Sequence, residues 1–188
     1  MEIRRWIAGR WAVGLIAACF LMVATGWSED TPAHIPVAHG TTLDGTVVVL
    51  PDALKGKTAV LVVGFSHASQ GQVTNWGRLI TAAYGKTAGL TYYEIPMLGG
   101  APKMLRGMIV KSVGKSVPAA EKPHFLPLTE DDKLWRAIAH YDKSDDAYLL
   151  LLDTDGTVRW QTQGEPTDAA FADFKKQLNG LLATTGAL

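Results

Sequence analysis

Two almost entirely apolar runs constrain the fold of this chain more than any other feature. Residues 58–65 read TAVLVVGF, and residues 147–153 read AYLLLLD. A strand with one wet face alternates polar and apolar residues, whereas a strand covered on both faces is apolar throughout. The first run therefore predicts a strand buried on both faces of a sheet, and the second predicts another strongly apolar strand.

The segment after the first run changes from strand periodicity to helix periodicity. Ser69 is a suitable residue for the N-cap of a helix, and Gly85 is suitable for its end. The apolar residues between them recur at helical spacing: Val73, Trp76, Ile80, Ala83 and Tyr84. Residues 90–98, LTYYEIPML, then predict another strand. Strand, helix and strand in this order predict a βαβ unit with parallel strands.

The C-terminal part predicts a hairpin followed by a helix. The turn signal TDGT follows the run at 147–153, and residues 158–164, VRWQTQG, form the expected antiparallel partner. Thr167 and Asp168 open a final helix. A helical insertion is expected between Gly99 and Tyr141. The predicted fold class is α/β: a thioredoxin-like arrangement with a central mixed sheet flanked by helices.

The N-terminus has the pattern of an export signal. Three arginines precede an uncharged run at residues 11–27, which predicts a signal peptide over residues 1–26. An uncleaved membrane anchor and a lipid on Cys19 are alternatives. We expect a linker at 27–40 and the thioredoxin-like domain at 41–188. Export would place the domain in the periplasm or on the periplasmic face of the inner membrane.

Charge and cysteine content exclude several classes of function. The chain has 18 Lys and Arg against 18 Asp and Glu, so no basic surface favours nucleic-acid binding. Its one cysteine, Cys19, lies in the export segment, which excludes a disulfide, a catalytic thiolate or a CxxC pair in the domain. The five histidines have no metal-ligand spacing, and neither a metal nor another cofactor is expected.

The loop at residues 64–72, GFSHASQGQ, is the main candidate for a site. Residues 64–68 fit the G-x-S-x-A pattern of the nucleophile elbow of a serine hydrolase, with Asp153 as the candidate acid. That fold needs a catalytic histidine after the acid in the chain, and no histidine follows His140. Residues 69–72 occupy the position of a redox CxxC without a thiol. The loop is then either a tight turn or a binding surface at a helix N-terminus. The candidate binding residues are Ser66, His67, Ser69, Gln70 and Gln72.

The insertion begins with a basic segment that also carries Met104 and Met108. An amphipathic helix with its apolar face in the core is the default expectation. The alternative is a helix that lies on a partner protein or on the inner-membrane surface. The basic residues of this candidate face are Lys103, Arg106, Lys111 and Lys115.

Three short motifs carry a resemblance to a known family. They are VVGFS at 62–66, NW at 75–76, and LLLLDTDGTVRWQTQGEPT at 149–167. These motifs are similar to the thioredoxin-like assembly factor of the mitochondrial ATP synthase and its bacterial relatives. The resemblance implies a thioredoxin-like fold without a redox pair, and a role in assembling a membrane subunit of the synthase.

The sequence therefore predicts a redox-inactive, non-catalytic protein of the cell envelope. We expect it to act as a binding or assembly factor, with a membrane complex as the candidate protein partner. The alternative hypothesis is an enzyme that uses the loop at residues 66–72.

Overall fold

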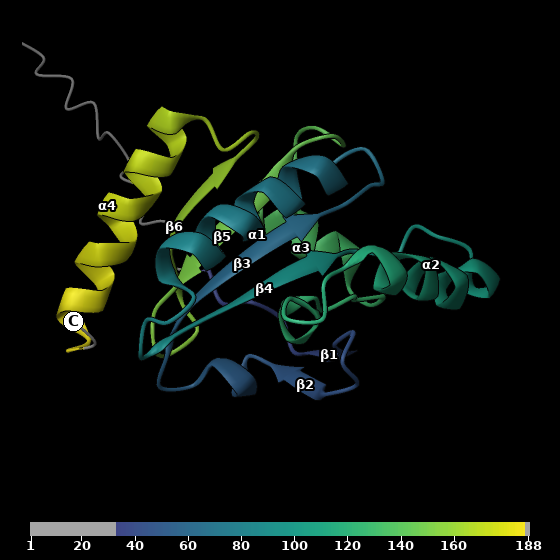
Figure 1. The fold of residues 1–188 in the computed structure, drawn as a ribbon, viewed down its shortest axis with the longest axis horizontal. Helices are drawn as coiled ribbons and strands as arrows, with labels where there is room; N and C mark the ends of the chain where they lie inside the picture. The colour runs from purple at the N-terminus through teal and green to yellow at the C-terminus, as the bar shows by residue number, and fades with distance from the viewer. Residues whose placement is uncertain (1–32, 187–188) are drawn as a thin grey trace, which may run out of the picture. The chain divides into compact units, whose positions relative to one another are not determined.

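The computed structural model of the chain describes residues 33–186 (Figure 1). The predicted signal peptide and Cys19 lie outside the described residues. The strands are β1 (Ala38–Thr41), β2 (Val47–Leu50), β3 (Thr58–Gly64), β4 (Leu90–Pro96), β5 (Ala147–Leu152) and β6 (Val158–Gln163). The helices are α1 (Gln70–Tyr84), α2 (Lys103–Ser116), α3 (Asp132–Ile138) and α4 (Asp168–Thr184), with 3-10 turns η1 (Asp52–Leu54) and η2 (Lys122–His124).

The main sheet has four strands in the order β4-β3-β5-β6. β3 runs parallel to β4, with Thr58 opposite Leu90. β5 runs antiparallel to β3, with Leu150 opposite Leu61, and β6 runs antiparallel to β5. This confirms the predicted βαβ half, the ββα half and the mixed sheet.

The two central strands are buried on both faces, which confirms the prediction made for residues 58–65. Every residue of β3 and of β5 is buried. On one face, Val60 and Val62 pack with Trp76 of α1 and Phe174 of α4. The opposite face of β3 packs against the β1–β2 hairpin, η1 and α3. Because both faces of these strands are apolar, each side of the sheet packs against its own layer of helices or strands.

Part of the segment that we expected to be a linker belongs to the folded core. Ile35 and Ala38 are 4% and 1% exposed. The amide of Val158 donates to the Ala33 carbonyl over 2.9 Å, and β1 pairs with β2. Residues 33–40 thus pack on the domain, because the side chains of Ile35 and Ala38 point inward, while Val37 stays exposed.

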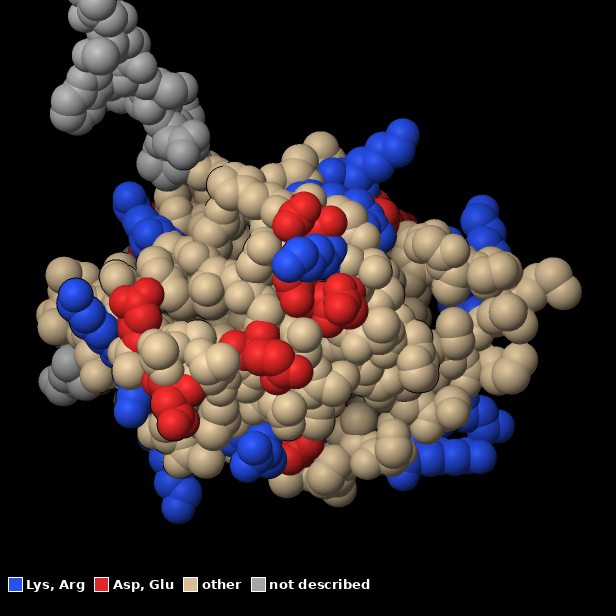
Figure 2. Space-filling view, turned by 90° about the horizontal axis from the view of Figure 1, so that it is seen from above, with Lys and Arg blue, Asp and Glu red and all other residues tan. Residues whose placement is uncertain are grey.

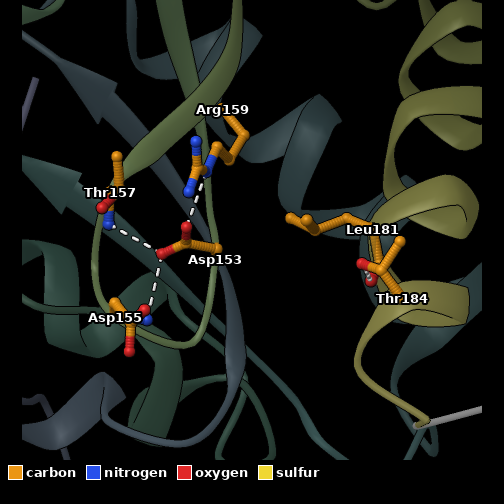
Figure 3. A network of polar contacts seen from close by, with 6 residues as sticks. All are labelled: Asp153, Asp155, Thr157, Arg159, Leu181 and Thr184. Atoms are coloured by element: carbon orange, nitrogen blue, oxygen red, sulfur yellow. Dashed lines mark hydrogen bonds and ion pairs between the residues drawn. The ribbon is translucent and has the colours of Figure 1, made fainter. Parts of the chain in front are cut away.

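The β5–β6 hairpin is held by Asp153 (Figure 3). One carboxylate oxygen accepts hydrogen bonds from the amides of Asp155 and Thr157, each over 3.0 Å, and the other accepts from Arg159 Nε over 2.6 Å. Burial raises the pKa of Asp153, but these hydrogen bonds outweigh burial and hold it below its ordinary value. The D-T-D-G-T-V-R motif therefore has a structural role in this turn.

Helix α2 lies beyond the ends of β3 and β4, far from α4 (Figure 1). It has no buried residue. The default expectation of a core-facing apolar side is therefore wrong for this helix. Across residues 33–186, no helix combines the length and the apolar character needed to cross a membrane.

Candidate functional site

The loop between β3 and α1 is organised by the hydroxyl of Ser66. This hydroxyl donates a hydrogen bond to the carbonyl of Ser144 and accepts from the amides of Ala68, over 3.0 Å, and Ser69, over 3.3 Å. A nucleophilic serine needs a neighbouring base that takes its proton. Here the proton is directed to a backbone carbonyl, and the hydroxyl holds the turn.

Ser69 takes the predicted position before α1 but does not cap the helix with its side chain. Its backbone is helical, with φ −75° and ψ −9°, and its hydroxyl donates back to the Ser66 carbonyl over 2.9 Å. A side-chain cap requires an extended N-cap backbone, so this geometry turns the oxygen away from the helix amides. The predicted location is correct, and the predicted cap bond is wrong.

The other loop residues divide into one structural residue and two that face the solvent or the groove. Gln72 Oε1 accepts from the amide of Ala147 over 2.9 Å, which joins α1 to the start of β5. His67 is exposed and Gln70 is half-buried. Among the described residues, the side chains of His67 and Gln70 form no hydrogen bond, so they are the loop groups available to a ligand.

A groove of about 650 Å³ lies between this loop and α2. Its floor is apolar and includes Phe65, Val73, Met97 and Phe125, and its α2 wall includes Ile109 and Val113. The polar groups at its surface are hydroxyls, an amide and an imidazole, because no Asp, Glu, Lys or Arg lines it. This lining suits an uncharged, largely apolar ligand.

The four predicted basic residues of α2 have different surroundings. Arg106 donates through Nε to the Ala101 carbonyl over 3.0 Å and through one terminal nitrogen to the Gly99 carbonyl over 2.9 Å. It therefore fixes the turn before α2. Lys103, Lys111 and Lys115 are exposed.

A buried acid beside the groove was not predicted from the sequence. Glu94 of β4 is 6% exposed and packs on Gly77 of α1. Burial, followed by the nearby charge of Glu121, raises the pKa of Glu94 from 4.5 to about 8. The sequence did hold a signal for a buried acid. Glu94 is a carboxylate inside the run LTYYEIPML, and it lies two residues after the buried Tyr92, on the same face of the strand.

The sequence of the chain matches a known family. The family model described as ATP10 protein matches residues 18–181. The chain belongs to the ATP10 family. This is a family of ATP synthase assembly factors. Among curated proteins, no sequence matches the chain.

Solved structures show which fold the ATP10-family chain has. BsSco, a member of the Sco family of cytochrome c oxidase assembly proteins, aligns with a TM-score of 0.56 and 12% identity over 80% of this chain and 94% of its own. The lipoprotein thioredoxin Etrx1 from Streptococcus pneumoniae aligns with a TM-score of 0.55 and 14% identity over 76% and 100%. The thioredoxin domain of a thiol-disulfide oxidoreductase from Bacteroides vulgatus gives 0.53 and 18% over 78% and 96%. The thioredoxin-like fold is confirmed.

In this ATP10-family chain the helix N-terminus at residues 69–72 reads SQGQ. Ser69 and Gln72 are tied into the scaffold there, and the groove opens beside them. The candidate site is therefore the groove together with His67 and Gln70, while Ser66, Ser69 and Gln72 hold its rim in place.

Proposed function

We propose that this chain is a non-catalytic assembly factor of the cell envelope that holds an uncharged segment of a membrane-complex subunit. ATP synthase is the first candidate complex because the chain belongs to a family of ATP synthase assembly factors. The proposed site is the groove between the β3–α1 loop and α2.

The single observation that carries this proposal is the uncharged, apolar lining of the groove. Subunits that cross a bilayer present long apolar segments, which need cover before they are assembled. Phe65, Met97 and Ile109 offer such cover, and methionine adapts to varied side chains. The Ser112 hydroxyl and the Gln70 amide at the rim can bond to backbone amides and carbonyls of a bound segment.

The chemistry available at the loop supports binding over catalysis. Residues 69–72 hold no cysteine, so the thiolate needed for disulfide exchange has no source there. The hydroxyl of Ser66 is engaged by three backbone groups, and His67 makes no hydrogen bond to it within residues 33–186. The alternative hypothesis of an enzyme using residues 66–72 thus has no activated nucleophile to build on.

The proposed location rests on the sequence of the N-terminus. Basic residues followed by the uncharged run at 11–27 favour export. The domain would then act in the periplasm or on the periplasmic face of the inner membrane, next to its client.

Photo-crosslinking from the groove tests this function. The full chain would carry a small aliphatic diazirine amino acid, which leaves the groove open, at Ser112, which is exposed and lines the groove, or at Ala172 on α4 as the matched control. After illumination of intact cells, the adducts are identified by mass spectrometry. We expect a membrane subunit of ATP synthase from position 112 and none from position 172. Equal capture from both positions, or adducts with no membrane-complex subunit, would refute the proposal.

A further inference from the structure

Four side chains of α2 form one outward stripe. Met104, Met108, Lys111 and Lys115 follow one another at intervals of four, three and four residues, which places them on one side of a helix. Met104 is 93% exposed and Met108 is 63% exposed. Both lysines are exposed as well. Two large apolar side chains thus stand beside two cations on an exposed surface.

Another side of α2 faces the protein. Ile109 and Val113 are half-buried over the groove. A Cβ on Gly114 would lie 3.7 Å from Leu43, so this part of the helix approaches the N-terminal hairpin. The outward stripe, in contrast, has no partner among the residues that the structure describes. Exposing two neighbouring methionine side chains to water costs free energy unless another surface covers them.

The charge that α2 and its flanking residues carry has one sign. No Asp or Glu occurs between Glu94 and Glu121 in the sequence. Figure 2 shows acidic side chains over the middle and the left of the view, with only basic and uncharged side chains at the right-hand edge, where α2 lies in Figure 1. A chain with a formal net charge of zero therefore presents a locally cationic edge.

We propose that the outward stripe of α2 lies on an anionic lipid surface. The methionines enter the boundary between headgroups and acyl chains, and Lys111 and Lys115 bind the lipid phosphates with their ammonium groups. The positive charge of the stripe complements the anionic headgroups of lipids. The stripe is also a narrow row of long flexible side chains with no pocket between them, which suits a lipid surface better than a shaped protein surface. The groove opens on a different side of α2.

This inference rests on the proposed function for the presence of a membrane nearby, but its test needs no client protein. In the proposed arrangement α2 separates the lipid surface from the groove. A client segment that leaves the bilayer would then reach the groove over one helix diameter, about 10 Å.

Vesicle binding of the full purified chain tests the inference. Binding to vesicles of phosphatidylcholine alone is compared with binding to vesicles that also contain phosphatidylglycerol, so that the N-terminal apolar segment contributes to both. The test variant is Lys111→Gln/Lys115→Gln, and the matched control is Lys57→Gln/Lys86→Gln, which removes two exposed lysines elsewhere.

We expect phosphatidylglycerol to raise the affinity of the wild type and of the control by about tenfold, and to raise that of the test variant far less. A Met104→Ser/Met108→Ser variant should bind both vesicle types more weakly. Equal gains for wild type and test variant would overturn the inference. So would stripe variants that bind lipid normally but lose the crosslink from position 112, because the stripe would then be a protein interface. If the stripe variants lose lipid binding and the wild type forms no crosslink from position 112, the inference about the stripe stands. Only the proposed function is then overturned.

Discussion

The carboxyl group of Glu94 packs directly on the backbone of Gly77, so closely that a Cβ on residue 77 would lie 1.9 Å from a carboxyl oxygen. The contact joins the edge strand β4 to the middle of α1. It lies one helical turn from Val73, which lines the groove. A buried acid and a glycine that makes room for it therefore set the distance between helix and sheet next to the proposed site.

The stability of the domain should depend on the protonation of Glu94. The folded state binds this proton more tightly, because the pKa is raised from 4.5 to about 8. The stabilisation is therefore fully present below pH 4.5 and is lost as the pH rises to about 8, by at most on the order of 5 kcal/mol. Urea unfolding across this range measures it.

The matched variant for this prediction is Glu94→Gln, which keeps the shape of the side chain and does not titrate. Its free energy of unfolding should stay nearly level over the same pH range and exceed that of the wild type at the alkaline end. Parallel pH curves for the two proteins would show that Glu94 does not carry the effect.

Substitution of the glycine should disturb the same contact from the helix side. We expect Gly77→Ala to reduce the free energy of unfolding by about 1–3 kcal/mol, because the new methyl group displaces the Glu94 carboxyl. The control is Gly71→Ala in the same helix, where a Cβ meets open space and alanine should stabilise by up to about 1 kcal/mol. Thermal or chemical unfolding gives both values. Equal effects of the two substitutions would contradict the close contact at residue 77.

The loop serine should behave as a structural residue. Ser66→Ala removes one donor and the acceptor of two amides, so it should lower the free energy of unfolding by about 1–2 kcal/mol. Ser112→Ala, an exposed hydroxyl at the same groove, should change it by less than about 0.5 kcal/mol. Chemical unfolding of the two variants decides. A stable Ser66→Ala protein would remove the structural role that we assign to this hydroxyl.

The sequence was sufficient to predict the sheet because its two central strands are apolar on both faces. The positions of Ser69 and Thr167 before their helices were also predictable, and the Thr167 hydroxyl accepts from the amide of Ala170 over 3.2 Å as expected of a cap. Ser69 differs because capping depends on the backbone angles of the residue, which its identity does not determine.

The candidate site was less predictable because it depends on contacts between distant segments. Helical spacing revealed the apolar residues of α2 but not whether a core would cover them. The structure places Ile109 and Val113 beside a groove and leaves Met104 and Met108 exposed. Glu94 looked like an ordinary polar residue in a strand, since its partner Gly77 belongs to the preceding helix. The single hydrogen bond of Gln72 to Ala147 likewise joins residues far apart in the sequence.

Assembly of ATP synthase in cells tests the central claim most directly. Cells that lack the chain would be complemented with the wild type, with Ser112→Trp, which places a large ring at the groove, or with Ala172→Trp on the exposed face of α4. The amount of assembled complex in the membrane is then measured on native gels at matched levels of the chain. We predict that Ser112→Trp reduces the assembled complex and that Ala172→Trp restores it fully. Normal assembly with Ser112→Trp would contradict the account.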